Sequence, residues 1–285
     1  MNILTIAQRF PTQESCIEHL ERIKWNGKPH CPYCNSEKVA RKTEALHIGR
    51  WNCHNCLSTF KVMSGTIFQG TKIPLQKWFA AIAILLNAKK TVSSYQLARD
   101  LDLNQKTAWY IATRIRKAMT GDSALLRGIL EAGETYLGGK PRHKGQSKRG
   151  RGSKKLPVLG AVERDGKVVA AKMEYLSAGK IKNFLMAHVN RDAMLITDQY
   201  RAYAPMDYVL DRKTINHSVE YVSGILHTNT IAGFWALLKR ALTGQHHHYT
   251  VGHAAMYIDE ACYKYNTRKS ETPWDDFMAR AVGVA

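Results

Sequence analysis

Apolar residues recur at helical spacing in the first part of the chain. A small helical segment is expected over residues 1–25, where Thr12 with Glu14 supplies a helix start. Pro74 begins a second helical stretch, whose apolar face includes the run from Trp78 to Leu86. That run is far shorter than the roughly 20 residues that a bilayer requires, so we expect no membrane span.

Two more helices are expected next, joined by a short turn. Residues 93–101 form the first, Asp102-Leu103-Asn104 the turn, and Gln105 to about Met119 the second. This pattern predicts a helix-turn-helix DNA-binding domain over residues 70–122, although a purely structural bundle of three helices would share it. The residues expected to meet DNA are Gln105, Lys106, Thr107 and Tyr110 at base edges, and Arg114, Arg116 and Lys117 nearer the backbone.

From about residue 128 the pattern changes to alternating strands and helices. Strands are expected over 129–137, 156–162, 168–174, 194–197 and 214–222, and helices over 177–189, after His227, and over 251–268. Asn229 or Thr230 can cap the helix that follows His227. This order is typical of a ribonuclease-H-like α/β core, a mixed sheet flanked by helices. We assign that core to residues 128–285.

Cysteine spacing adds a metal site. Cys31 and Cys34 form one Cys-x-x-Cys pair, and Cys53 and Cys56 form a second one after eighteen intervening residues. Four thiolates close a tetrahedral shell, so we predict a zinc ribbon with a structural zinc ion within residues 1–65. Four buried or redox-active cysteines are the alternative. Two leftover cysteines and no recognisable signal peptide favour a reducing, cytoplasmic location.

The charge of the chain points to a polyanionic partner. Lys and Arg number 42 and Asp and Glu 23, which gives a formal charge of +19. Double-stranded DNA is the expected partner and an anionic membrane surface the rival. A basic insertion over 140–155 lacks apolar residues and is interpreted as a phosphate-tracking arm rather than a solvated linker. Its candidate DNA contacts are Arg142, Lys144, Lys148, Arg149, Arg151, Lys154 and Lys155.

Besides the zinc ribbon and the helix-turn-helix, the chain contains, in this order, the blocks Glu134–Lys140, Thr197–Tyr203, His227–Arg240 and Tyr263–Arg268. Together these features resemble the ISXO-like group of bacterial insertion-sequence transposases. The resemblance implies a DDE-type transposase that uses two Mg²⁺ or Mn²⁺ ions to cleave and join DNA at terminal inverted repeats. It also implies at least a homodimer on paired DNA ends, in the nucleoid of a bacterial cytoplasm.

The resemblance implies three acid positions, and two of them hold other residues here. The first is Gly133, the second Asp198 and the third Ala232. Asn229 lies three residues before Ala232 on nearly the same helix face, and some members of the family use Asn as the third ligand. Lys239 matches a basic residue of the family and is expected, with Arg240, to contact the DNA backbone.

The main hypothesis is therefore a transposase-family DNA-binding protein that is catalytically impaired as written. The two replacements fit either a natural inactive relative or deliberate substitution. The alternative is an active transposase or nuclease that uses Asp198 with atypical ligands such as Glu131 and Asn229. A third hypothesis is a zinc-dependent adaptor for other proteins, which predicts a binding affinity that does not change with salt concentration.

Overall fold

The computed structural model describes residues 1–43, 48–121, 125–138, 155–216, 222, 224–246 and 249–283. The chain divides into two compact units, one made of Met1–Met119 with Ser270–Ala285 and the other of Thr120–Lys269. Within the described ranges, every helix falls short of the length or apolarity needed to cross a lipid bilayer.

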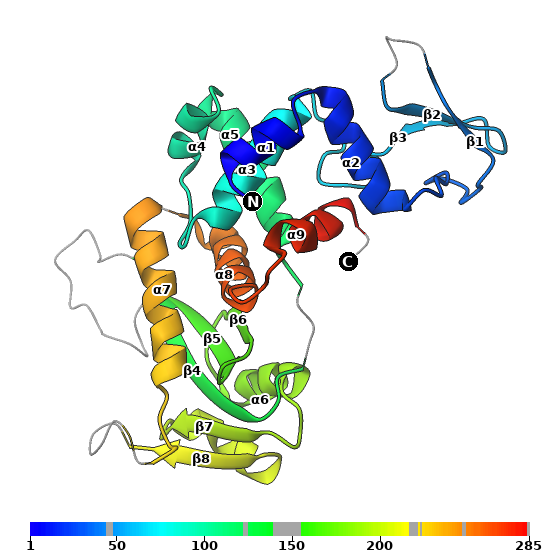
Figure 1. Ribbon diagram of the computed structural model, residues 1–285. Coiled ribbons are helices and arrows are strands. Elements are labelled where there is room, and N and C mark those ends of the chain that lie inside the picture. Colours follow the sequence, from blue (N-terminus) through cyan, green and yellow to red (C-terminus); the bar gives the residue numbers. More distant parts are fainter. Residues whose placement is uncertain are drawn as a thin grey trace. The chain divides into compact units, whose positions relative to one another are not determined.

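The first unit is a helical bundle that carries a small sheet. Thr12 caps its second helix through a reciprocal pair of bonds with Ser15. Phe10, Phe79 and Trp274 pack against one another in the core of the bundle. Its helices are α1 (Ile3–Arg9), α2 (Gln13–Trp25), α3 (Leu75–Asn87), α4 (Ser94–Asp100), α5 (Gln105–Ala118) and α9 (Pro273–Val282) (Figure 1).

The last helix, α9, was not expected from the sequence and belongs to this first unit. It contacts α2, α3 and α5, and the backbone N–H of Ile67 donates to the carbonyl of Ala281 at 3.1 Å. The expected core boundary of 128–285 therefore runs too far, because residues 270–285 group with the N-terminal part. We expected residues 1–65 and 70–122 to be separate domains, but residues 1–65 and 70–119 fall within one compact unit.

Three short strands make the small sheet. β1 (Val39–Arg41), β2 (Arg50–Cys53) and β3 (Thr59–Lys61) pair antiparallel in that order. Trp51 on β2 lies across from Phe60 on β3, and both rings lie near that of Trp25. This aromatic cluster is small, so the sheet needs support beyond its own packing.

The second unit is built on a five-stranded mixed sheet. Its strands are β4 (Ile129–Leu137), β5 (Leu156–Glu163), β6 (Val168–Lys172), β7 (Met194–Asp198) and β8 (Asp211–Ile215), in the order β6-β5-β4-β7-β8. β5 runs antiparallel to β4 and β6, whereas β4, β7 and β8 are parallel. This order and these directions confirm the ribonuclease-H-like α/β core.

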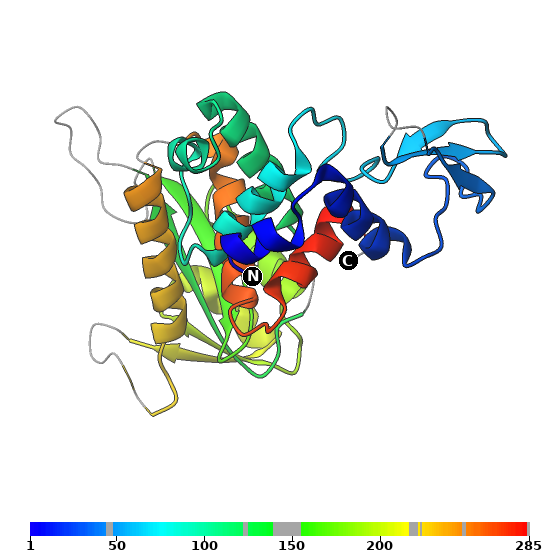
Figure 2. The same cartoon turned by 45° about the horizontal axis from the view of Figure 1, so that its top comes forward.

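Helices cover both faces of the sheet (Figures 1 and 2). α6 (Ala178–His188) and the 3₁₀ helix η2 (Arg201–Tyr208) pack on the face that carries Leu130, Ala132, Leu159 and Ala161. α7 (Asn229–Gln245) and α8 (Val251–Asn266) pack on the opposite face, which carries Leu137, Val158, Val162, Val168 and Ala170. The alternation of side chains along each strand thus divides the apolar residues between two cores.

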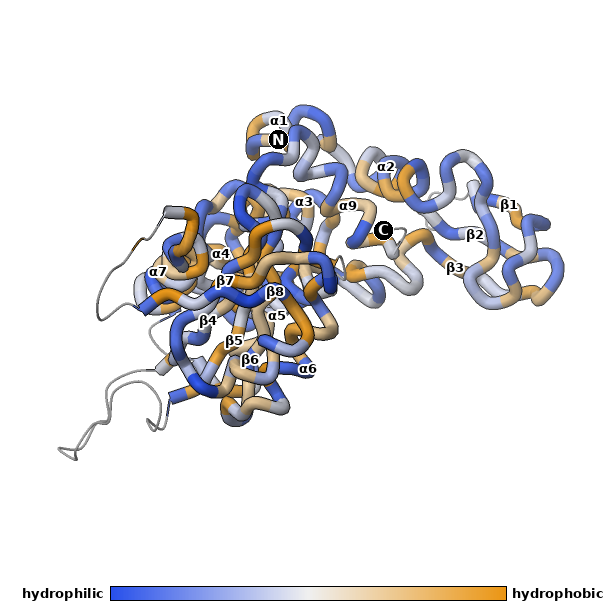
Figure 3. Tube along the Cα trace, turned by 90° about the horizontal axis from the view of Figure 1, so that it is seen from below, coloured by the Kyte–Doolittle hydropathy of each residue, from blue (hydrophilic) through white to orange (hydrophobic). Residues whose placement is uncertain are grey.

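The outer strand β8 differs from the expected position. A strand was predicted over 214–222, and it instead occupies Asp211–Ile215; residues 217–221 lie outside the described part. β8 is an edge strand that is mostly polar, as Figure 3 shows along its tube. Hydrophobic alternation therefore gave little signal there, and pairing with β7 sets its position.

His19 should make the first unit sensitive to acid. Its side chain is buried between Phe10 and Phe79. Burial, and then the charges of Arg9 and Arg22, lower the pKa of His19 from 6.5 to about 4. The folded unit keeps the ring neutral, whereas the unfolded chain protonates it below pH 6.5. Stability is therefore complete above pH 6.5 and lost as the pH falls toward 4, by up to about 3 kcal/mol.

The measurement is urea unfolding of this unit between pH 4 and 7, compared with a His19→Leu variant. The variant should lose this part of the pH dependence while retaining the slopes that belong to other groups. An unchanged slope in the variant would exclude His19 as its source.

Candidate functional site

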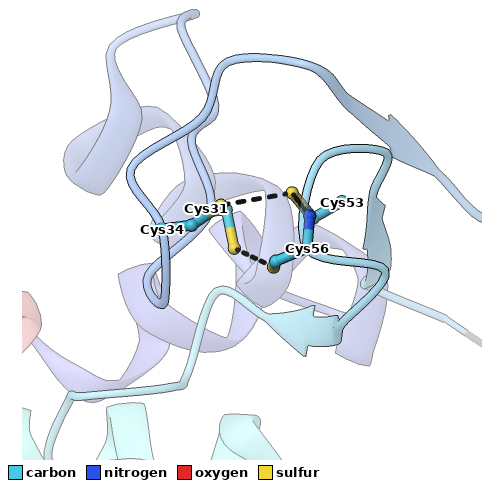
Figure 4. Close-up of side chains that lie close together, drawn as sticks. All are labelled: Cys31, Cys34, Cys53 and Cys56. Atoms are coloured by element: carbon cyan, nitrogen blue, oxygen red, sulfur yellow. Dashed lines mark hydrogen bonds between the residues drawn. The ribbon is translucent and has the colours of Figure 1, made fainter.

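Four cysteine thiols converge in the first unit. Figure 4 shows them facing one another from the two Cys-x-x-Cys turns, which we call the first knuckle (Cys31 and Cys34) and the second knuckle (Cys53 and Cys56). Their sulfur atoms all lie within 4.8 Å of one another, with 3.5 Å between Cys34 and Cys53 and 3.6 Å between Cys31 and Cys56. Tetrahedral zinc with Zn–S bonds of about 2.3 Å requires sulfur separations of about 3.8 Å, so the four residues fit a structural zinc ion.

Backbone groups of the second knuckle favour the thiolate form. The N–H groups of Cys56 and Asn55 donate to the Cys53 sulfur at 3.5 and 3.4 Å and lower the pKa of that thiol. Hydrogen bonding with Ser58 lowers the pKa of Cys56 to about 6. Burial raises the pKa of Cys31 to about 11. The second Cys-x-x-Cys pair therefore favours the thiolate form more than Cys31 does, and a bound cation would favour the thiolate of Cys31 as well.

The helix-turn-helix segment has the expected local geometry. Asp102 adopts a left-handed conformation with φ of 48° in the turn, and the Asn104 side chain accepts from the N–H of Thr107 at 2.8 Å to cap α5. Lys106 is exposed at the start of α5. Gln105, by contrast, donates to Ser94 at 2.9 Å, which ties its amide to α4.

Two basic residues further along α5, Arg114 and Arg116, bond within the bundle, whereas Lys117 is exposed. Arg116 is 1% exposed and donates to the Thr91 hydroxyl at 3.0 Å and to the Val92 carbonyl at 2.9 Å. The expectation that Arg116 lies near the DNA backbone is therefore wrong. Arg114 donates to the Gln69 carbonyl at 2.7 Å and to the hydroxyl of Tyr110.

In the second unit, a carboxylate from the sheet caps α7. Glu131 of β4 is 0% exposed. Its Oε2 accepts the backbone N–H groups of Thr230 at 2.8 Å and Ile231 at 3.0 Å. Its Oε1 accepts from the Thr230 hydroxyl at 2.9 Å and from Arg164 Nε at 2.8 Å, and lies 3.1 Å from His227 Nδ1. The negative charge sits where the helix dipole favours it.

This capping explains where α7 begins and differs from the expectation. We predicted that Asn229 or Thr230 would cap the helix with its own side chain, but the helix begins at Asn229 after Thr228, which makes no side-chain cap bond. Glu131 supplies the acceptors from a strand about 100 residues earlier in the chain. Because both of its oxygens are bonded within the protein, Glu131 is poorly placed to be the substitute metal ligand that we had considered.

Asp198 ends β7 beside the strand that carries Gly133. The register pairs Glu131 with Ile196, and two residues further along each strand bring Gly133 beside Asp198. The Asp198 carboxylate is half-buried and accepts from the N–H of Tyr200 at 3.1 Å. Arg212 Nε donates to the Thr197 hydroxyl at 2.9 Å, which fixes the end of the strand.

The other predicted positions lie on or near α7. Gly133 faces this helix, because a Cβ at that position would lie 3.5 Å from Ile231 Cγ2. Asn229 and Ala232 are exposed on the first turns, and Ile231, Phe234, Trp235 and Leu238 are buried against the sheet. Glu134, the neighbour of Gly133, points to the other face and accepts from the Tyr203 hydroxyl at 3.1 Å.

Basic residues continue along the exposed side of α7. Lys239 and Arg240 are exposed. Lys239 lines a pocket of about 350 Å³ together with Lys155, Tyr249 and His246. The remaining predicted contacts of the basic insertion lie outside the described residues, namely Arg142, Lys144, Lys148, Arg149, Arg151 and Lys154.

Replacing Glu131 should loosen the start of α7. In the Glu131→Ala variant, the largely buried Arg164 side chain would lose its carboxylate partner. The backbone N–H groups of Thr230 and Ile231 would lose their acceptor. We expect a loss of about 3–5 kcal/mol in the unfolding free energy of the second unit. Hydrogen exchange at the first turn of α7 measures this directly.

The matched control is Glu174→Ala. Glu174 pairs with Lys180 at 3.1 Å but is 82% exposed, so its loss should change stability by no more than about 1 kcal/mol. Equal effects of the two substitutions would contradict the capping role of Glu131.

Comparison with known proteins now identifies the two domains. Residues 125–266 match the ISXO2-like transposase domain, and residues 11–59 match the transposase zinc-ribbon domain. Over these two segments, the chain is similar to ISXO2-like transposases. An uncharacterized protein in transposable element ISH50 of Halobacterium salinarum is 29% identical over 252 residues, which cover 82% of this chain and 84% of that protein. We had expected a bacterial source. Because this relative is archaeal, the match does not by itself indicate one.

Two solved structures show distant similarity to this chain. The Mos1 strand transfer complex matches with 15% identity and a TM-score of 0.30, over 72% of this chain and 73% of that one. The simian T-cell lymphotropic virus intasome in complex with PP2A regulatory subunit B56 gamma matches with 14% identity and a TM-score of 0.29, over 55% of this chain. The match spans 57% of the intasome chain. Since both scores are low, the fold assignment rests on the order and the directions of the strands.

Proposed function

We propose that this member of the DDE transposase family acts mainly by binding DNA and that its strand-transfer site is catalytically impaired. The observation that carries this proposal is the set of side chains at the three acid positions. Asp198 supplies a carboxylate at the end of β7, whereas its neighbour position on β4 is Gly133 and the position on α7 is Ala232. The family match implies DNA cleavage and strand transfer, and the proposal concerns how far this chain retains them.

The residues present do not fit a two-metal centre. Two Mg²⁺ ions need several carboxylate ligands to offset their charge. Among the described residues, the four cysteines are the only group of three or more His, Cys, Asp or Glu side chains close enough to share one metal ion. The Glu131 carboxylate is committed to α7 and Arg164, and the Asn229 amide is neutral.

Charge supports DNA as the partner. The formal charge is +19, and Lys106 on α5 and Lys239 and Arg240 on α7 are exposed. When exposed Lys and Arg side chains neutralise DNA phosphates, the counterions condensed on the DNA are released, and this release favours binding. We propose terminal inverted repeats, or a site derived from them, as the DNA bound, with at least a homodimer on paired ends.

The experiment measures binding and cleavage together. The chain is mixed with a duplex carrying the repeats that flank its gene and with a scrambled duplex, from 50 to 200 mM salt. We expect affinity to fall steeply with salt and no strand cleavage in Mg²⁺ or Mn²⁺. Lys239→Ala should weaken binding and reduce the salt slope by about 1, whereas Lys182→Ala, on α6 at the opposite face of the sheet, should not.

Other outcomes select other functions. Binding that does not depend on salt would favour a protein adaptor. Cleavage that disappears in Asp198→Ala would show that the chain is an active enzyme with an unexpected ligand set.

A further inference from the structure

Trp235 of α7 lies over two glycines that face each other across the sheet. Gly133 of β4 and Gly160 of β5 are paired in the register. A Cβ at Gly160 would lie 2.7 Å from Trp235 Cη2 and 3.0 Å from Cζ2, so the indole ring excludes any side chain there. Gly160 is therefore required by the packing of Trp235.

Gly133 has no such structural reason to be glycine. A Cβ there would lie 3.5 Å from Ile231 Cγ2 and 3.7 Å from Trp235 Nε1, which are ordinary contacts. Its backbone is not among those with positive φ. The fold therefore accepts a side chain at position 133 and refuses one at position 160.

The indole nitrogen of Trp235 is a buried donor that lacks an acceptor within the described part of the chain. Trp235 is 7% exposed, and its Nε1 has no hydrogen-bond partner among the described residues. An indole N–H can only donate, and buried donors without partners are rare and costly. A Cβ at position 133 would lie 3.7 Å from this nitrogen. A carboxylate oxygen two bonds beyond that Cβ comes within hydrogen-bond distance of the nitrogen.

We propose that the Trp235 indole N–H is a positioning donor for an acidic side chain at position 133, a donor that the glycine leaves without its acceptor. The inference rests on the proposed function insofar as position 133 is one of the acid positions of the site. A donor held by α7 would fix the rotamer of a carboxylate on β4 and so set the direction of its second oxygen. Trp235 is then a positioning residue rather than a catalytic one.

A double-mutant cycle tests the contact without DNA or divalent metal beyond the structural zinc. The full zinc-loaded chain is compared with Gly133→Asp, Trp235→Phe and the combination, by urea unfolding of the second unit. Trp235→Phe should lower the folding equilibrium constant at least about tenfold more in the Gly133→Asp chain than in the original chain, because the bond is made only there. Equal effects in both backgrounds would overturn the proposal.

Two further variants keep the test decisive if the carboxylate introduced at position 133 and that of Asp198 repel each other. Gly133→Asn offers a neutral oxygen acceptor and Gly133→Ala offers none. In ¹⁵N-labelled protein, the Trp235 indole N–H signal should move downfield in the Gly133→Asp and Gly133→Asn variants but not in the Gly133→Ala variant. Trp274, whose buried Nε1 also has no partner among the described residues, belongs to the other unit and supplies a control signal that should stay unchanged.

The result can be separated from the proposed function. The cycle and the indole signal report on the 133–235 contact alone. A coupled pair in a chain that does not bind DNA would overturn the proposed function and keep the contact. DNA binding with an uncoupled pair would overturn the positioning role only.

Discussion

The Gly133→Asp, Ala232→Glu double variant is expected to cleave repeat-containing DNA in Mg²⁺, where the original chain does not. The two substitutions would add carboxylates beside Asp198 and on the first turns of α7, which together form the ligand set that two metal ions require. Position 133 accepts a Cβ at ordinary contact distances, and position 232 is exposed, so both side chains fit. We expect a gain of about a thousandfold or more over background, since the groups of such a site act as a unit.

Because cleavage should depend on all three carboxylates together, variants that lack one of them are the controls. Each single substitution should stay close to background, and Asp198→Ala added to the double variant should abolish cleavage. Strand cleavage on a matched repeat duplex measures all four variants, with DNA binding recorded in parallel. If the double variant binds DNA but does not cut it, the assignment of positions 133 and 232 as the missing acids fails.

Local patterns predicted most of the elements. β4 spans the residues expected for it, α5 begins directly after the turn expected at Asp102-Leu103-Asn104, and the cysteine spacing led to the observed cluster. Such features depend on neighbours in sequence, so a window of a few residues is enough to predict a strand or a helix cap. α9 was overlooked although Pro273 and the spacing of Trp274, Phe277 and Ala281 carry a helical signal.

Contacts between distant segments were not predictable from the same patterns. Arg116 shares a helix face with Ala112, which favours burial, but its partners Thr91 and Val92 lie about 25 residues earlier. The roles of Glu131 and Arg164 depend on a helix about 100 and 65 residues further on. The signal was the type of residue: one ionisable side chain within the apolar first half of β4, which a fold tolerates only with partners.

The candidate site illustrates the same limit. Resemblance located positions 133, 198 and 232, but whether Glu131 could replace a missing acid depended on where its oxygens point. Strand alternation places Glu131 and position 133 on one face, which kept the substitution open. The hydrogen bonds to Thr230 and Ile231 decide against it, because a carboxylate that caps a helix has no free direction for a metal ion.

Removing zinc should unfold the ribbon and leave the rest of the first unit folded. β1, β2 and β3 contain three or four residues each, too few to stabilise a sheet, and apparent zinc binding contributes about 10–16 kcal/mol in comparable sites. A strong chelator, or Cys53→Ser, should abolish amide protection over residues 50–61 and preserve it in α3 and α5. Cys16→Ser, which changes a buried cysteine outside the cluster, should retain one zinc ion per chain. Protection of β2 and β3 that survives complete zinc removal would mean that the cysteines are not the main support of this sheet, and that Trp25, Trp51 and Phe60 hold it instead.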